Sequence, residues 1–344
     1  MAQQLIYTSC PVSLVRGRSG FSTVARGAGM GEALASMVER CSSYDSSAVS
    51  GPVFSHRIVR CGSSNWHVLT RTCDCGTDYT NRNNYIAHHL VLSEEEAAGL
   101  ACNSAQAMLY WDGWLDSWSG EPRYIEDVDL SGIPAPSELP ARRWEKFFSD
   151  AGCAACLSES GGEIRGGRKD SPTVLGLFAE SLSLFVNPLD SWRVTYTTRY
   201  FESDNSADFL WKGISADGQP PRQDVADLAS GKAPEFPNCR AAEYARTGEL
   251  NNIEKFNLKA AKPEFGARRF EVVVPERRAP GSAAIILSGA VVGLAILVAA
   301  LLFVNFAEGA ERVPADFGRA SAGDCGGHSK EFGKDATFLA GYDD

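Results

Sequence analysis

The chain has 344 residues and a net charge of −10, and 44% of its residues are hydrophobic. This composition is typical of a folded protein, and its negative charge is poorly suited to holding a phosphate backbone, so we expect no nucleic-acid partner. The first ten residues, MAQQLIYTSC, have neither the basic start nor the apolar core of a signal peptide, so none is expected.

The first 132 residues predict a lobe rich in strands. A β-prone run, Leu5–Ser9, precedes a glycine-rich segment at 17–31, and apolar residues at helical spacing follow over Gly31–Cys41. Further strands are predicted over Phe54–Arg60, Trp66–Thr72 and Asn84–Leu92. The sequence Ser93-Glu94-Glu95-Glu96 then has the pattern of a capping box, which indicates the start of a short helix.

The segment Ile133–Pro140 holds three prolines and is the predicted boundary before a second lobe. Beyond it we expect helices over Ser137–Leu157, Pro172–Phe185 and Cys239–Asn251, strands over Trp192–Tyr200 and Phe209–Ile214, and a loop over Ala216–Pro237. Because strands and helices do not alternate regularly, the pattern favours an α+β fold with a mixed, largely antiparallel sheet or sheets and packed helices. The two lobes are expected at residues 1–132 and 141–250.

A long uncharged segment near the C-terminus predicts one transmembrane helix. Residues 279–307 are 29 in succession without a charge, and their apolar centre, 283–304, is 22 residues long. At about 1.5 Å per residue this helix would measure about 33 Å, which is close to the thickness of a bilayer's hydrocarbon core. A basic tether at 251–282 would lead to this span, and an acidic tail at 305–344 would follow it.

The basic residues around the span predict its orientation. Six basic residues lie in the twenty or so positions before it and two in the twenty after it: Lys259, Lys262, Arg268, Arg269, Arg277 and Arg278, against Arg312 and Arg319. The positive-inside rule then places the large N-terminal part in the cytoplasm and the tail outside it. Within the span, Gly289 and Gly293 would let two helices approach closely, which allows a homodimer. Cys325, in the tail, is expected to form an interchain disulfide.

Two pairs of closely spaced cysteines are candidate zinc ligands. The pairs are Cys73 with Cys75 and Cys153 with Cys156, and His88 or His89 could complete a tetrahedral site. Their spacing differs from the zinc-ribbon pattern, and a reducing cytoplasm keeps such residues as thiols, so we favour buried structural cysteines. We therefore expect no cofactor, with zinc as the alternative.

Two further patterns are compatible with a cysteine nucleophile and with a phosphate-binding loop, but neither is a complete motif. A cysteine nucleophile, Cys10 or Cys73, would need an imidazole base within hydrogen-bond reach, but His88 shares its predicted strand face with apolar residues and is interpreted as a core histidine. The glycine-rich segment lies between a predicted strand and a predicted helix, as phosphate-binding loops do. It lacks both the ending of a P-loop and the spacing of a dinucleotide motif. We therefore favour a protein that is not an enzyme and expect no catalytic residues.

The polar turn at residues 77–84 (TDYTNRNN) leads directly into a predicted strand. Its Asp and Asn side chains could serve only to satisfy the backbone of the turn itself. Alternatively, the turn could be a recognition loop on a rigid scaffold, in which the planar guanidinium of Arg82 would bind a carboxylate or a phosphate. The sequence leaves both interpretations open.

Five segments, taken in order over roughly residues 3–250, resemble a known family. They are QLIYTS (4–9), SGFSTVA (19–25), DYTNRNNYIAHHLVL (78–92), WRVTYTT (192–198) and AEYARTG (242–248). Together they resemble the type 2 N-terminal domain of bacterial GTPase-associated protein 1. Longer members of that family continue into further domains, where this chain has the predicted span and tail.

The resemblance implies an adaptor or regulator with a small-GTPase-like partner, often with a MoxR-type AAA ATPase nearby, in bacterial conflict systems such as phage defence. Combined with the span, it predicts a single-pass protein of the inner membrane with a cytoplasmic N-terminal domain. The residues expected to contact the partner are Ser19, Gly20, Phe21, Asp78, Arg82, Asn83 and Asn84. The alternatives are a membrane effector that assembles through its span and a zinc- or cysteine-dependent enzyme.

Overall fold

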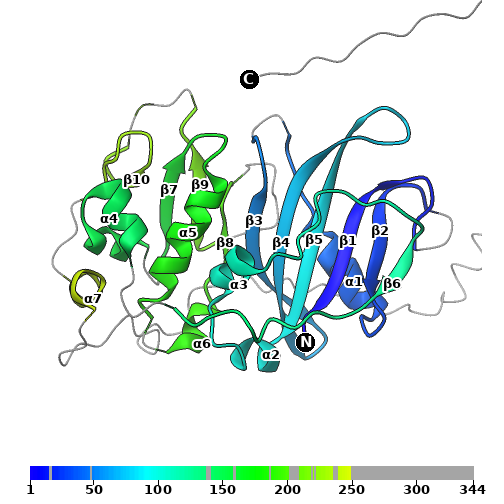
Figure 1. Ribbon diagram of the computed structural model, residues 1–344, viewed down its shortest axis with the longest axis horizontal. Coiled ribbons are helices and arrows are strands. Elements are labelled where there is room, and N and C mark those ends of the chain that lie inside the picture. Colours follow the sequence, from blue (N-terminus) through cyan, green and yellow to red (C-terminus); the bar gives the residue numbers. More distant parts are fainter. Residues whose placement is uncertain are drawn as a thin grey trace, which may run out of the picture. The chain divides into compact units, whose positions relative to one another are not determined.

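A computed structural model describes residues 1–14, 18–46, 49–136, 141–157, 160–185, 187–200, 209–217, 220, 222–234 and 239–248 (Figure 1). The predicted tether, span and tail, with Gly289, Gly293 and Cys325, lie outside these residues. Within the ranges given above, no helix is both long and apolar enough to cross a membrane.

Ten strands of the described chain form one mixed sheet (Figure 1). They are β1 (Gln3–Cys10), β2 (Gly20–Gly27), β3 (Val53–Cys61), β4 (Ser64–Thr77), β5 (Asn83–Ser93), β6 (Arg123–Ile125), β7 (Gly162–Gly166), β8 (Tyr196–Thr197), β9 (Trp211–Ser215) and β10 (Ala226–Asp227). Their order across the sheet is β10-β7-β9-β8-β3-β4-β5-β1-β2-β6. The middle of the sheet, from β8 to β2, is antiparallel, whereas β6 at one end and β9, β7 and β10 at the other join in parallel.

The helices pack on both faces of this sheet. They are α1 (Glu32–Glu39), α2 (Glu94–Ala98), α3 (Ser104–Tyr110), α4 (Arg142–Phe148), α5 (Ser171–Leu182), α6 (Pro188–Ser191) and α7 (Arg240–Thr247), with one 3₁₀ helix, η1 (Ala151–Cys156). Successive side chains of a strand point to opposite faces. Leu69 and Leu90 therefore pack with α3, α4 and α5, while Val68 and Val91 pack with α1. The expected α+β class, with a large mixed sheet and packed helices, is confirmed.

Most of the elements predicted in the first lobe are confirmed, and the glycine-rich segment is the exception. The strands at 5–9, 54–60, 66–72 and 84–92 and the helix at 31–41 all form, with somewhat different ends. The capping box is present, with the Ser93 hydroxyl accepting from the Glu96 N–H and the Glu96 carboxylate accepting from the Ser93 N–H. The glycine-rich segment, however, contains β2, because Val24 and Ala25 are fully buried against the sheet. The interpretation of this segment as only a connection between a strand and a helix was therefore wrong.

The second lobe shows larger differences. Of the predicted strand Trp192–Tyr200, only β8 forms. Trp192 and Val194 are buried in alternation with their neighbours, as in a strand, but they pair with no other strand of the described sheet. The helix expected at Ser137–Leu157 is interrupted at Ser149, whose φ of 63° ends α4 before η1 begins; residues 137–140 of that prediction lie outside the described chain. The 192–200 and 209–214 segments pair through the parallel ladder of β8 and β9.

Candidate partner-binding surface

The two segments predicted to contact a partner meet at one end of the sheet. Gly20, at the start of β2, pairs with Cys10 at the end of β1, and β1 in turn pairs with β5. The β4–β5 turn lies at the same end, because β5 starts where the antiparallel β1 finishes (Figure 1). We call the resulting patch the sheet-end surface: Tyr7, Ser19, Gly20, Phe21, Tyr44, residues 78–84 and Tyr85.

The β4–β5 turn is organised around the carboxylate of Asp78. Its Oδ1 accepts from the Thr80 N–H at 2.7 Å, the Thr80 hydroxyl at 2.6 Å and the Arg82 N–H at 3.1 Å, while Oδ2 accepts from the Ser9 hydroxyl at 2.8 Å. These hydrogen bonds, the one from Thr80 first, hold the pKa of Asp78 well below its usual value. Asn81 adopts a left-handed conformation with φ of 60°, which asparagine tolerates better than most residues. The turn therefore has a fixed shape.

Arg82 is the charged group that this turn presents to solvent. Its side chain is 69% exposed, whereas that of Asp78 is 1% exposed. Its Nε donates to the Thr80 hydroxyl at 2.7 Å, and its Nη2 lies 3.5 Å from Asp78 Oδ2. The guanidinium is thus oriented by two contacts within the turn, and most of its surface is open to solvent. An oriented planar donor of this kind suits a carboxylate or a phosphate of another molecule.

Asn84 joins the turn to β1 rather than facing outward. Its Oδ1 accepts from the Ser9 N–H and from the Thr8 hydroxyl, both at 3.2 Å. The side chain is therefore a positioning group, whereas Asn83 is exposed at the start of β5. Asp78 thus satisfies the backbone of the turn, as the first interpretation expects, and also contacts the exposed Arg82. The role of a recognition loop stays a prediction.

A row of aromatic side chains adjoins this turn. Phe21, on β2, reaches over β1 and stacks on Tyr85 of β5 with ring centroids 4.5 Å apart; its ring is also 6.1 Å from that of Tyr7. Tyr44, from the loop after α1, lies 5.5 Å from Tyr85. Phe21 is 38% exposed, and Tyr79, in the turn itself, is 50% exposed. Burial raises the pKa of Tyr44 to about 12 and that of Tyr85 further, so both phenols stay neutral.

The residues Tyr7, Tyr44 and Tyr85 were not among the candidates chosen from the sequence. Tyr7 and Tyr85 belong to two different predicted strands and Tyr44 lies between predicted elements; only the strand order β5-β1-β2 brings Tyr7 and Tyr85 beside Phe21. A signal was available in part, because Tyr85 directly follows the chosen segment and Tyr7 lies two residues before Ser9. Ser19 is exposed and Gly20, with φ of 86°, makes the turn into β2, so both lie beside Phe21 as expected from their positions in the chain.

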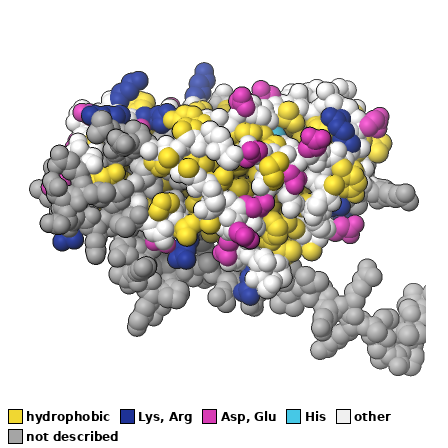
Figure 2. Space-filling view, turned by 60° about the horizontal axis from the view of Figure 1, so that its bottom comes forward, with side chains coloured by type: hydrophobic (Ala, Val, Ile, Leu, Met, Phe, Trp, Pro, Cys, Tyr) yellow, Lys and Arg dark blue, Asp and Glu magenta, His cyan; other side chains and the backbone are white. Residues whose placement is uncertain are grey.

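The opposite end of the sheet has a different character. It carries α2, whose first turn holds Glu94, Glu95 and Glu96. Figure 2 brings that end forward and shows acidic side chains spread over much of the described surface. Because β5 has eleven residues, about 30 Å separates α2 from the β4–β5 turn. The exposed guanidinium of Arg82 therefore lies far from the acidic side chains of α2.

The cysteines proposed as zinc ligands lie in different parts of the structure. Cys73 and Cys75 are on β4, and Cys73 packs against the face that contains Cys10, whereas Cys153 and Cys156 are in η1 and pack against the cluster of α4 and α5. Burial raises the pKa of all four thiols. Across the described ranges, no group of three or more His, Cys, Asp and Glu side chains is arranged to hold a metal ion. The zinc site stays a prediction without support from these residues.

The cysteine–histidine pair proposed as a nucleophile and base is not brought together in the described structure. The Cys10 thiol donates to the Gly20 carbonyl at 3.6 Å, and Cys73 Sγ accepts from the Arg71 guanidinium at 3.6 Å. Burial raises the pKa of the Cys10 thiol. A nucleophilic cysteine needs the opposite environment, one that favours the thiolate.

The histidines of the central strands are core residues, as interpreted for His88. His88 Nδ1 accepts from the Leu115 N–H at 3.2 Å, so its Nε2 carries the proton that it donates to Gln4 Oε1 at 3.0 Å. Its ring packs edge-on against Trp111 and Trp114, with both centroids at 5.3 Å. Burial lowers the pKa of His88 to about 3, so the ring is neutral at ordinary pH.

The other three described histidines are equally enclosed. His56 Nδ1 donates to the Val194 carbonyl at 2.8 Å and its Nε2 faces His67 Nδ1 at 3.1 Å. His89 lies between the hydroxyls of Ser42 and Thr70, at 2.8 and 2.9 Å. Burial is the first cause that lowers the pKa values of all three, to about 3 for His56 and His89 and about 4 for His67.

Comparison with known proteins identifies one part of the chain. No curated protein and no solved structure matches it. The resemblance of segments 192–198 and 242–248 falls outside the matched residues and stays a prediction. Residues 1–130, which include the whole sheet-end surface, match the family described as GTPase-associated protein 1, N-terminal domain type 2, so the resemblance inferred from the sequence is confirmed over this range.

Proposed function

We propose that this protein is a membrane-anchored adaptor that recruits or senses a GTPase-like partner through the sheet-end surface. The observation that carries the proposal is the position of this surface: all its residues lie within the range that matches a GTPase-associated domain. The family description concerns association with a GTPase, so a surface for a protein partner is the feature to expect in this range.

The composition of the surface suits protein recognition. Aromatic residues and arginine are enriched in the centres of protein interfaces, where they supply large contact areas with few rotatable bonds. Here Phe21 and Tyr79 are partly exposed beside the oriented Arg82. Because hydrogen bonds of Asp78 already fix the turn, a partner would have little loop ordering to impose on binding.

The membrane anchor is part of the proposal and rests on the uncharged segment at 279–307 with its basic N-terminal flank. We place residues 1–250 in the cytoplasm of a bacterium, with a single span in the inner membrane. Extraction of membranes at alkaline pH should leave the full-length protein in the pellet. Protease added to intact spheroplasts should shorten the chain by no more than its C-terminal tail, whereas digestion of the N-terminal domain would contradict this orientation.

The wider system proposed for this adaptor is a bacterial defence system in which an AAA ATPase acts beside the GTPase. Support comes from the family resemblance alone. Deletion of the gene should then change the efficiency with which a phage forms plaques. Phage sensitivity that is the same with and without the gene, across a diverse set of phages, would contradict the defence role.

The partner itself can be tested directly. Full-length protein is purified from gently solubilised membranes of its own host, captured proteins are identified, and their GTP binding is measured by crosslinking to a labelled GTP analogue. We expect capture of a GTP-binding protein, lost with Arg82→Ala or Phe21→Ala and retained with Tyr124→Ala, an exposed aromatic on β6 outside the surface. Capture of a GTP-binding protein with all three variants would place the interface elsewhere.

A second candidate is a membrane effector that assembles through its span, favoured by the spacing of Gly289 and Gly293. It predicts that the double substitution Gly289→Ile with Gly293→Ile abolishes self-association in membranes and any toxicity on overexpression. The adaptor predicts instead that capture of the GTPase survives this double substitution.

A further inference from the structure

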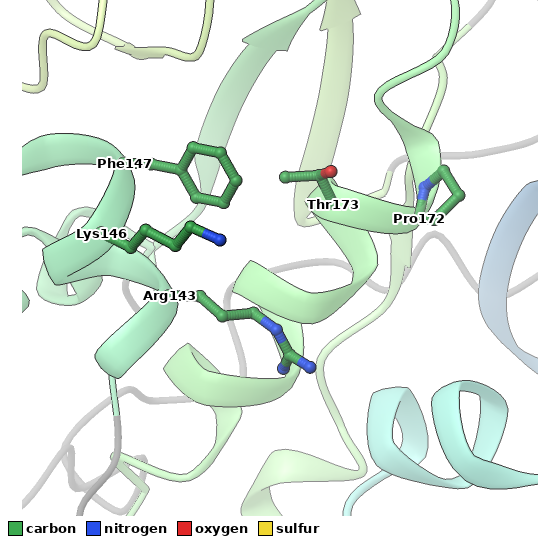
Figure 3. Close-up of a pocket in the computed structure, with 5 residues that line it drawn as sticks. All are labelled: Arg143, Lys146, Phe147, Pro172 and Thr173. Atoms are coloured by element: carbon green, nitrogen blue, oxygen red, sulfur yellow. The ribbon is translucent and has the colours of Figure 1, made fainter.

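A pocket of about 270 Å³ lies between α4 and the start of α5, outside the residues that match the family (Figure 3). Arg143, Lys146 and Phe147 line it from α4, and Pro172 and Thr173 line it from α5. In Figure 3 the ammonium group of Lys146 and the ring of Phe147 project from α4 toward Thr173. The pocket thus combines two cationic groups, one hydroxyl and an apolar wall.

The positive charge at this pocket is only partly compensated. Within the described part of the chain, Lys146 forms no ion pair, and its ammonium lies 5.9 Å from the centre of the Phe147 ring. Arg143 Nη1 lies 3.7 Å from Glu180 Oε1. That carboxylate already accepts from the Arg143 N–H at 2.9 and 3.1 Å and from the Trp144 N–H at 3.4 Å, so it also caps α4. Glu180 therefore pairs with Arg143, while no ion pair of the described residues neutralises Lys146.

The side chain of Arg143 is held in place by its contact with α5. A Cβ added at Gly176 would lie 2.9 Å from Arg143 Cδ and 3.0 Å from Nε, so the stem of the arginine lies directly against this glycine. A side chain held in this way loses little freedom when its guanidinium binds a ligand. The close contact also explains why a residue without a side chain occupies position 176, in the interior of a helix where glycine is otherwise unfavourable.

We propose that this pocket binds a phosphate monoester. A phosphate carries more than one negative charge at neutral pH and several acceptor oxygens, which suits a pocket lined by two cations and a hydroxyl. A carboxylate has one charge and is satisfied by a single arginine. The ring of Phe147 and the ring of Pro172 form an apolar wall for the group that carries the phosphate. Free phosphate and an aromatic phosphate monoester share this chemistry, and the apolar wall favours the second.

The test is a calorimetric titration of the full-length, detergent-solubilised protein with phenyl phosphate, inorganic phosphate and benzoate. We expect saturable binding of phenyl phosphate, weaker binding of inorganic phosphate and no measurable binding of benzoate. Lys146→Gln and Arg143→Gln should each weaken phenyl phosphate binding by about tenfold or more, as expected for loss of a charge-assisted hydrogen bond. Arg40→Gln, which removes an exposed positive charge at the end of α1, is the matched control and should bind as the wild type does.

Two results would overturn the proposal. One is the absence of saturable binding of phenyl phosphate, or binding of benzoate with equal affinity. The other is an affinity that Lys146→Gln leaves unchanged or that Arg40→Gln lowers equally, since the attraction would then be non-specific. Lys146 is exposed, so its substitution leaves folding intact, and Arg82→Ala should not change the titration because Arg82 belongs to a different surface.

Discussion

The Ser9 hydroxyl donates to Asp78 Oδ2 across 2.8 Å and ties the end of β1 to the β4–β5 turn, although 69 residues separate the two in the chain. Both side chains are buried. The remaining hydrogen bonds of this carboxylate are local to the turn. The bond to Ser9 therefore ties the turn to β1, together with the two hydrogen bonds that Asn84 accepts from Ser9 and Thr8. The direction in which Arg82 faces solvent depends on this contact.

Substitution of Ser9 by alanine should therefore loosen the turn. We expect the free energy of unfolding to fall by about 1 to 2 kcal/mol, because a buried carboxylate oxygen loses a hydrogen bond, and capture of the GTP-binding partner to weaken. Urea denaturation followed by circular dichroism measures the first effect. Ser131→Ala is the control, since its hydroxyl donates to Asp129 at 2.9 Å within an exposed turn. Equal stabilities for the two variants would contradict this role of Ser9.

Phe21 should be the aromatic anchor of the sheet-end surface. Phe21→Ala removes the stack on Tyr85, for which we expect a loss of about 1 kcal/mol in stability and a much larger loss in partner capture. Phe21→Tyr should keep most of both. If Phe21→Ala left capture unchanged while Arg82→Ala abolished it, the aromatic row would be a structural feature of the sheet.

The four buried histidines should make the fold sensitive to mild acid. Their pKa values in the folded protein, about 3 for His56, His88 and His89 and about 4 for His67, lie below the ordinary value of 6.5. The histidines of the unfolded chain therefore bind protons near pH 6.5, whereas those of the folded chain stay neutral. The free energy of unfolding is thus highest above pH 6.5 and decreases as the pH falls below it. Each histidine contributes about 1.4 kcal/mol per pH unit once the unfolded form is protonated.

Urea midpoints measured from pH 7 to pH 5 test this expectation, because carboxylates titrate mainly below that window. We expect the midpoint to fall steadily through it. A midpoint that stays constant from pH 7 to pH 5 would show that the folded protein binds protons at these rings as readily as the unfolded chain does.

Gly213, on β9, should tolerate no side chain. A Cβ added there would lie 2.0 Å from the Thr198 carbonyl oxygen and 2.5 Å from its carbon, so the two backbones would have to separate. We expect Gly213→Ala to lower the free energy of unfolding by about 3 kcal/mol, or to prevent expression of folded protein. Gly132→Ala, where a Cβ would meet no atom within 4 Å, should be nearly neutral. The melting temperatures of the two variants, measured against the wild type, test this prediction, and equal melting temperatures for the two would contradict it.

Much of the first lobe could be predicted from local patterns. The Ser93 capping box, the β-branched and aromatic residues of β3 to β5 and the spacing in α1 involve residues close together in the sequence, so they can be seen in the chain itself. The strand β2 could not, because the burial that stabilises it comes from β1 and β6 on either side. Likewise Trp192 and Val194 alternate like strand residues but lie outside the ladder, where Trp192 packs edge-on against His56 and His67 of the central strands.

The sequence by itself determined the class of the fold and the family resemblance of residues 1–130, and it suggested the two short segments proposed as a partner surface. Tertiary structure alone decided that these segments adjoin, since only the antiparallel order β4-β5-β1-β2 brings Gly20 and Asp78 to the same end of the sheet. It also added Tyr7, Tyr44 and Tyr85 to the surface and turned Asn84 inward. Hydrogen bonds and ring contacts between residues far apart in the chain follow from strand order, and strand order is set by the packing of the whole core rather than by any local pattern.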